Sequence, residues 1–250
     1  MILRNENIIN PDQSIQIQLP QIWEHDGFLI LRDDLLPGGT KRRILTEILG
    51  KVPNKEIVYP AHPYGHGQLA LALSCLPYRK KVTLLLPKLN SSRVPKVLSE
   101  TLALSNVSYQ VILNATSQSE VFQYAEKYAQ EISDRYLFPI GFNTKEFLIG
   151  LKNLALSLPI VPTNVWVLAG SGLLVSALKL AWPNAKINAV NMGFSHVNLT
   201  GADNVYNAPE SPFEPAKVLP PFPSASYYDA KLWQFVKLYA EKGDFVWNVA

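Results

Sequence analysis

The stretch FLILRDDLLPGGTKRRI, residues 28–44, carries the features on which the fold prediction depends. Its first five residues, FLILR, predict a strand, and the proline and glycines after them predict a turn. Apolar residues then recur with helical spacing, with Thr40 as the expected N-cap and Gly50 as the expected end. Lys41 would lie in the first turn of this helix. Such a lysine is either an ordinary surface cation or a reactive amine, and the rest of the chain has to distinguish the two.

The order of strand, turn and helix repeats along the chain. Short aliphatic runs alternate with longer segments of helical period, which is typical of parallel strands joined by crossover helices. The predicted strands are residues 28–32, 56–60, 82–87, 107–113, 136–138, 164–169 and 186–191. The predicted helices are about residues 41–50, 66–76, 92–104, 118–132, 144–157, 171–182 and 229–242. The sequence therefore predicts an α/β protein with mainly parallel sheets.

One segment breaks this alternation. Residues 193–226 contain six prolines and show no regular period, so we expect a long ordered loop there. Long loops inside compact domains are often functional.

The composition indicates a globular protein. With 250 residues and 48% hydrophobic content, the chain is long enough to bury a sizeable core. A net charge of +3 is too small to indicate nucleic-acid binding by itself. Cys75 is the single cysteine, which excludes an internal disulfide and favours a reducing, cytoplasmic location. No signal peptide or membrane span is evident, because glycines and Lys179 interrupt the longest apolar stretch, so we expect a soluble protein.

A second glycine-bearing turn occurs in VWVLAGSGLLVSAL, between a predicted strand and a predicted helix. Gly170, Ser171 and Gly172 would place free backbone N–H groups and the positive end of a helix dipole at one point, which suits a phosphate. A tight packing turn is the alternative. A dinucleotide fingerprint fits poorly, because Val175 replaces its third glycine and the next strand ends at Asn191 rather than at an acid.

Two further polar loops follow predicted strands. AHPYGHGQ contains His62, Tyr64 and His66, but a proline and glycines interrupt any common face, so we expect no metal site. FPIGFNTKE supplies Gly141 and Asn143. All four turns come after strands, and ligand sites of open α/β sheets gather at the carboxyl ends of the strands.

These segments together resemble a known family. FLILRDDLLPGGTKRRI resembles the lysine segment of fold-type II pyridoxal-phosphate-dependent enzymes, the tryptophan synthase β-like superfamily, particularly its aminocyclopropane-carboxylate deaminase and D-cysteine desulfhydrase branch. GHGQLALA, PIGFNTKEFLIG and LAGSGLL are similar to later segments of that superfamily. The ending PPFPSASYYDAKLWQF…FVWNVA resembles short phage and bacterial members. The resemblance runs from about residue 20 to the end, and the order of the segments agrees.

The resemblance implies a two-lobed fold in which each lobe has three αβα layers. Residues 1–58 and 139–250 would form the larger, cofactor-binding lobe, and residues 59–138 the smaller lobe. A homodimer is compatible with the resemblance.

The resemblance also assigns catalytic residues. Lys41 matches the lysine that forms a Schiff base with pyridoxal 5'-phosphate, and His66 matches the histidine beside the pyridine ring. Tyr64 stands where the deaminase branch has its nucleophilic serine, and Gly65 replaces the asparagine expected before the histidine. These departures keep open a non-catalytic binding protein on the same scaffold.

Cofactor contacts carry over in the same way. The residues implied to bind pyridoxal phosphate are Lys41, His66, Gly141, Asn143, Gly170, Ser171 and Gly172. The phosphate loop departs from the family at residues 173 and 174, where leucines replace a second glycine pair.

The chemistry of lysine supports this assignment. A lysine must lose its proton before it attacks an aldehyde, yet its unperturbed pKa is about 10.4. A position in the first turn of a helix, beside Arg42 and Arg43, disfavours the ammonium form and predicts a lowered pKa for Lys41.

A phosphoribosyltransferase is the alternative enzyme class, because LILRDDLLPGGT also resembles that family's ribose-phosphate loop. Asp33 and Asp34 would then hold the ribose hydroxyls, while Gly38, Gly39 and Thr40 would surround the phosphate. Pro37 replaces an expected threonine, and the loop is one residue short.

The substrate is the least determined feature. Pyridoxal phosphate stabilises negative charge at a carbon next to an amine, so the resemblance implies a lyase, deaminase or decarboxylase acting at the α-carbon of an amino-acid-like molecule. That small-molecule amine is either free or attached to a nucleotide or DNA base, since short phage members of the superfamily are associated with DNA modification.

Overall fold

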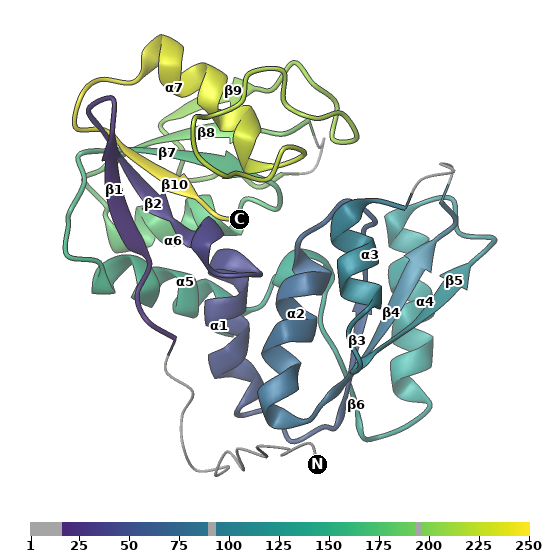
Figure 1. Cartoon of the computed structure of the whole chain (residues 1–250). Helices are drawn as coiled ribbons and strands as arrows, with labels where there is room; N and C mark the ends of the chain where they lie inside the picture. Colours follow the sequence, from purple (N-terminus) through teal and green to yellow (C-terminus); the bar gives the residue numbers. More distant parts are fainter. Residues whose placement is uncertain (1–16, 90–93, 194–196) are drawn as a thin grey trace, which may run out of the picture.

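The computed structural model describes residues 17–89, 94–193 and 197–250. Two sheets lie side by side, each with helices on both of its faces (Figure 1). The six-stranded sheet has the order β1-β2-β10-β7-β8-β9, and the four-stranded sheet has the order β5-β4-β3-β6.

The six-stranded sheet brings together strands from distant parts of the chain. β10 (Phe245–Asn248) lies parallel between β2 (Phe28–Arg32) and β7 (Asn164–Ala169). β8 (Lys186–Asn191) and β9 (Asn204–Asn207) extend the parallel part beyond β7. β1 (Gln21–His25) is antiparallel to β2 and forms the opposite edge.

The four-stranded sheet is wholly parallel. Its strands are β3 (Glu56–Pro60), β4 (Lys81–Pro87), β5 (Val107–Ile112) and β6 (Arg135–Leu137). The predicted lobe boundary at residues 58 and 59 falls inside β3. Because all of β3 pairs within this sheet, we propose that the smaller lobe begins before Glu56.

Helices connect the parallel strands. The α-helices are α1 (Gly39–Leu49), α2 (Gly67–Cys75), α3 (Lys96–Leu102), α4 (Gln118–Gln130), α5 (Lys145–Ser157), α6 (Leu173–Ala181) and α7 (Trp233–Tyr239). Short 3₁₀ segments are η1 (Asp33–Leu35), η2 (Leu76–Tyr78), η3 (Ile140–Phe142) and η4 (Asp229–Leu232). Among the described helices, none combines the length and the apolar character that a membrane crossing requires.

Alternating side chains of the strands form separate cores on the two faces of each sheet. In β7, Val165 and Val167 pack in the large core that includes α1, α2, α5 and α6, whereas Trp166 and Leu168 pack with η4 and α7. In β3, Val58 faces α4 and its neighbours in the strand face the large core. Figure 1 shows α1 and α2 where the two sheets approach each other.

The predicted fold class is confirmed: the structure is α/β, with three layers in each half and mainly parallel sheets. All seven predicted strands are present, and four of them have the predicted bounds. The predicted helix at 92–104 is shorter, Lys96–Leu102, and part of its predicted start lies outside the described residues.

Several predictions of local structure were wrong. Strands β1, β9 and β10 were not predicted, and β9 lies inside the segment expected to be one long loop. The helix expected at 229–242 is a 3₁₀ turn followed by α7, which ends at Tyr239. Thr40 is not an N-cap, because Gly38 occupies that position and the Thr40 side chain instead donates to Asp33.

Candidate functional site

The site is built around the first turn of α1, which brings Lys41 to the centre of the molecule. Gly38 and Gly39 both have positive φ, a conformation that side chains disfavour. A Cβ at Gly39 would lie 1.8 Å from the Val249 carbonyl oxygen, so this turn can pass the end of β10 only as glycine. The next amide, Thr40 N–H, donates to the same oxygen at 3.1 Å. The Val249 carbonyl, just after β10, therefore fixes where α1 begins.

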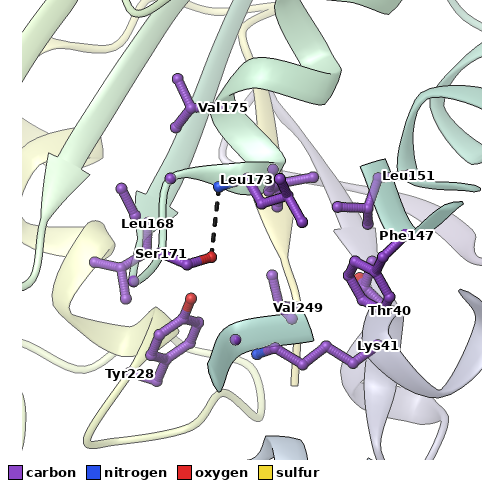
Figure 2. A pocket seen from close by; sticks show the side chains of 15 residues that line it. Thr40, Lys41, Phe147, Leu151, Leu168, Ser171, Leu173, Val175, Tyr228 and Val249 are labelled. Atoms are coloured by element: carbon purple, nitrogen blue, oxygen red, sulfur yellow. Dashed lines mark hydrogen bonds between the residues drawn. The ribbon is translucent and has the colours of Figure 1, made fainter. Parts of the chain in front are cut away.

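Lys41 lines a cavity of about 410 Å³, a volume that includes the open space at the cavity mouth. The cavity is lined by Thr40, Lys41, Gly141, Phe147, Leu151, Leu168, Ala169, Gly170, Ser171, Gly172, Leu173, Leu174, Val175, Tyr228 and Val249. Figure 2 shows the Lys41 and Tyr228 side chains directed toward this space, with Ser171 nearby.

Residues 170–172 form the wall at the N-terminus of α6. Gly172 is the N-cap, with φ +83°, and a Cβ there would lie 1.8 Å from the Asn198 carbonyl oxygen. The Ser171 hydroxyl accepts a long hydrogen bond from Leu173 N–H at 3.5 Å. The first N–H groups of a helix have no intrahelical partner, and here they belong to residues that line the cavity. This wall can bind an anion through backbone donors.

The loop after β6 completes that wall. Gly141 has φ +69° and approaches Ser171 so closely that a Cβ at Gly141 would lie 3.1 Å from the Ser171 Cβ. The Gly141 N–H donates to the Tyr59 hydroxyl, and the rings of Tyr59 and Phe142 stack with centroids 4.8 Å apart. These contacts hold the loop against the turn formed by residues 170–172. Asn143 of the same loop is exposed and is not among the residues that line the cavity.

The pKa of Lys41 is lowered, as predicted, but the cause differs from the expected one. Burial disfavours the ammonium form, and the negative charge of Asp229 opposes this effect. The adjacent arginines are not the cause, and Arg43 is itself paired with Asp33. A neutral amine is the form that can attack a carbonyl carbon.

Sequence reasoning missed Tyr228 and Asp229. The Tyr228 hydroxyl accepts a hydrogen bond from Gly170 N–H, and its ring centre lies 5.0 Å from Lys41 Nζ. Asp229 is 3% exposed; its Oδ2 accepts from Ala250 N–H at 3.0 Å, while Oδ1 has no partner among the described residues. Burial raises the pKa of Asp229 to about 8, against the opposing effect of Lys41. In sequence, Asp229 has no signal beyond that of an acid at a helix start.

His66 lies close enough to Lys41 for the lysine charge to act on it. Burial, and then the charge of Lys41, lower the pKa of His66 to about 4, so the imidazole is neutral at neutral pH. His66 precedes α2 as its N-cap residue and is partly buried. It is not among the residues that line the cavity.

Tyr64 belongs to an aromatic cluster that joins the loop after β3 to the segment before α7. Its ring centre lies 5.9 Å from that of Phe213 and 5.2 Å from that of Tyr227, and His62 stacks on Phe213 at 5.6 Å. His62 and Tyr64 follow β3 of the four-stranded sheet, whereas Phe213 and Tyr227 precede α7. Tyr64 is therefore near the site through Tyr227, the neighbour of Tyr228, but does not line the cavity.

Asp33 and Asp34 are engaged inside the protein. Asp33 is fully buried and accepts from Thr40 Oγ1 and Arg43 Nε, both at 2.5 Å. Asp34 accepts two hydrogen bonds of 2.8 Å from Arg32 and one from Asn248. Both carboxylates are thus occupied by contacts that a ribose would have to displace, and the phosphoribosyltransferase alternative loses its main support.

The sequence has no match among protein-family models or among curated proteins. Solved structures are similar in fold. An aminocyclopropane-carboxylate (ACC) deaminase homologue superposes with a TM-score of 0.73 at 15% identity, covering 89% of this chain and 84% of that one. A hydrogen sulfide-producing enzyme from Fusobacterium nucleatum gives 0.60 at 13% identity over 96% of both chains. Threonine deaminase isoform 2 from Solanum lycopersicum gives 0.62 at 13% identity, covering 89% and 78%.

These similarities define the class of fold. The chain has the tryptophan synthase β-like fold of the fold-type II pyridoxal-phosphate-dependent enzymes, as the order of the sequence segments predicted.

Proposed function

We propose that this protein is a pyridoxal-phosphate-dependent enzyme, a lyase or deaminase that acts at the α-carbon of an amine-bearing substrate. One observation carries the proposal: a lysine with a lowered pKa and a backbone anion-binding turn line the same cavity, in the fold that these enzymes share.

The residues present fit the cofactor. Backbone N–H donors can bind a phosphate, a neutral amine can react with an aldehyde, and an acid is one hydrogen-bond partner that suits a pyridine nitrogen. The cavity walls offer the start of α6 and Lys41. Asp229 lines the neighbouring cavity, with Ser224 and Asn248, rather than this one; it lies within electrostatic reach of Lys41, and its buried Oδ1 has no partner among the described residues. A buried unpaired carboxylate oxygen is costly unless a ligand completes its hydrogen bonds.

Each residue then has a defined role. Residues 170–172 would bind the phosphate, with Gly141 closing the turn from the other side. Lys41 Nζ would hold the cofactor covalently, and Asp229 would bond the ring nitrogen. Tyr228 would keep Gly170 in place while its ring flanks the lysine amine. When bound, the cofactor supplies an electron sink for the bond broken at the substrate α-carbon.

Proton movement falls to the chain's own groups. Lys41 Nζ would be the amine that takes a proton from the substrate α-carbon or returns it. His66 is neutral and cannot add a positive charge beside that amine. Tyr64 supplies a phenol where the resemblance places a nucleophile, and we keep it as a candidate acid for the leaving group.

Labelling tests the cofactor assignment directly. The protein is mixed with pyridoxal phosphate, reduced with borohydride and digested, and we expect the pyridoxyl mass on the peptide that contains Lys41. Lys41→Ala should abolish the label, whereas the exposed Lys237→Ala on α7 should keep it. An unlabelled wild-type protein, or a label on another lysine, would contradict the proposal.

The substrate is proposed as a free small amino acid, in keeping with the small net charge. An amine attached to a nucleotide or DNA base is the alternative that the experiment must separate. Cofactor-loaded protein is incubated with free amino acids and with aminoacylated DNA, and the products are identified by mass spectrometry. Turnover of the aminoacylated DNA, without turnover of free amino acids, would replace the free-amino-acid proposal.

Light scattering tests whether the protein forms the homodimer with which the resemblance is compatible.

A further inference from the structure

A buried chain of hydrogen bonds runs beneath Lys41. Trp247 Nε1 donates to Thr40 Oγ1 at 3.0 Å, and Thr40 Oγ1 donates to Asp33 Oδ2 at 2.5 Å. All three residues are at most 1% exposed. An indole N–H can only donate, so the threonine oxygen must accept from it and must point its single hydrogen at Asp33. The direction of the Thr40 hydroxyl is therefore determined.

The second oxygen of Asp33 binds α1 at Arg43, which follows Lys41 in the chain. Arg43 Nε donates to Asp33 Oδ1 at 2.5 Å, and Arg43 Nη1 donates to the Gln18 carbonyl. Thr40 and Arg43 are three residues apart, so they lie on one face of α1, and Lys41 projects from a different face. The Asp33 carboxylate thus binds α1 at one residue before Lys41 in the chain, Thr40, and at one residue after it, Arg43.

The backbone adds a third restraint. Thr40 N–H donates to the Val249 carbonyl, and Gly39 has no space for a side chain against that oxygen. Asp33 follows β2 and Trp247 is in β10, neighbouring strands of the sheet. The first turn of α1 is therefore fixed to two strands by polar contacts with defined directions, which apolar packing alone would not provide.

We propose that Asp33 and Thr40 are positioning residues that orient Lys41 for its reaction with an aldehyde. The inference rests on the proposed function. Condensation of the Lys41 amine with the aldehyde forms a C=N bond and releases one water, so its rate depends on how the nitrogen approaches the carbon. Neither Asp33 nor the Thr40 hydroxyl is needed to hold the phosphate, which the α6 turn would bind.

Matched threonine variants isolate the effect of the hydroxyl. Thr40→Val keeps the shape and removes the hydroxyl, whereas Thr40→Ser keeps it. Thr46→Val removes a buried hydroxyl from the same helix; among the described residues, that hydroxyl bonds only to the Arg42 carbonyl and the Ser74 hydroxyl. Stopped-flow absorbance after mixing each protein with pyridoxal phosphate gives the rate of the covalent step. We expect Thr40→Val to slow it about tenfold or more, and Thr40→Ser and Thr46→Val to stay near wild type.

A second measurement separates positioning from a general loss of structure. In a Lys41→Ala background no covalent bond forms, so fluorescence titration reports only noncovalent cofactor affinity. Adding Thr40→Val to that background should leave the affinity unchanged. An equal rate in Thr40→Val and wild type, or a Thr40→Val effect on noncovalent affinity as large as its effect on the rate, overturns the inference. Absence of any covalent step in the wild type would contradict the proposed function instead.

Should Thr40→Val fail to fold, Asp33→Asn gives the same test. The amide keeps the shape but loses the charge that pairs with Arg43. A slowed covalent step with unchanged noncovalent affinity supports the inference, and a wild-type rate overturns it.

Discussion

Lys41 Nζ lies 5.0 Å from the centre of the Tyr228 ring, and the hydroxyl of the same tyrosine accepts the N–H of Gly170. One side chain therefore contacts both the candidate reactive amine and the candidate phosphate loop. Burial lowers the pKa of Lys41, and a neutral amine gains little from the ring charge that attracts cations. The contact is best understood as a wall that orients the amine rather than as an ion pair with the ring.

We expect Tyr228→Phe to weaken cofactor binding, although the phenylalanine ring would still lie beside the Lys41 amine. The change leaves the half-buried Gly170 N–H without its acceptor, at a cost of about 0.5–1.5 kcal/mol. The affinity for pyridoxal phosphate, measured by fluorescence titration, should fall because residues 170–172 are held less firmly. Tyr239→Phe on α7, an exposed position, is the control. Unchanged affinity would show that the hydroxyl does not support the loop.

We expect Gly172→Ala to destabilise the protein strongly. Its φ of +83° disfavours a side chain, at a cost of about 1–3 kcal/mol, and the new Cβ would lie 1.8 Å from the Asn198 carbonyl oxygen. Gly243→Ala is a matched control, because Gly243 has φ +91° but nothing within 4 Å of the added Cβ. Urea unfolding should show a larger loss for Gly172→Ala. Equal losses would mean that backbone conformation, not contact with residue 198, dominates.

We expect Asp229→Asn to become more stabilising as pH rises. Burial raises the pKa of Asp229 to about 8, so between the unfolded value near 3.8 and this value the folded state binds more protons than the unfolded state. The wild type then loses stability with rising pH through this window, and the amide does not. Urea unfolding of both proteins without cofactor, from pH 4 to 9, measures the difference. A difference that does not change with pH would contradict the assignment.

We expect the opposite pH dependence at His66. Its folded pKa, about 4, lies below the usual 6.5, so the unfolded state binds the proton more tightly. The wild type should lose stability as pH falls from 6.5 to 4, and His66→Asn should lose less over the same range. NMR offers an independent check, since the His66 imidazole should stay neutral down to about pH 5. Titration near 6.5 would show that it is more exposed than the structure indicates.

The strands that the sequence failed to predict show where local patterns end. β10 has only four residues, FVWN, and becomes a central strand because it fits between β2 and β7. β1 did have a local signal: Asp26 and Gly27 both take positive φ, as in a two-residue hairpin turn, and Asp-Gly is typical of such turns. β9 is half exposed at a sheet edge and has no apolar run of its own.

The sequence by itself determined the alternation of strands and helices, and with it the turns that carry Lys41, Gly141 and residues 170–172. These features depend on local spacing and on glycines at strand ends, which neighbouring residues set. Only the tertiary structure placed Asp229 and Tyr228 beside Lys41 and Gly170, because Asp229 comes 188 positions after Lys41 in the chain and no local period connects them. It also decided the cause of the lowered pKa of Lys41: burial, which depends on how the sheets and helices pack, and not the charge of the arginines that follow it in the chain.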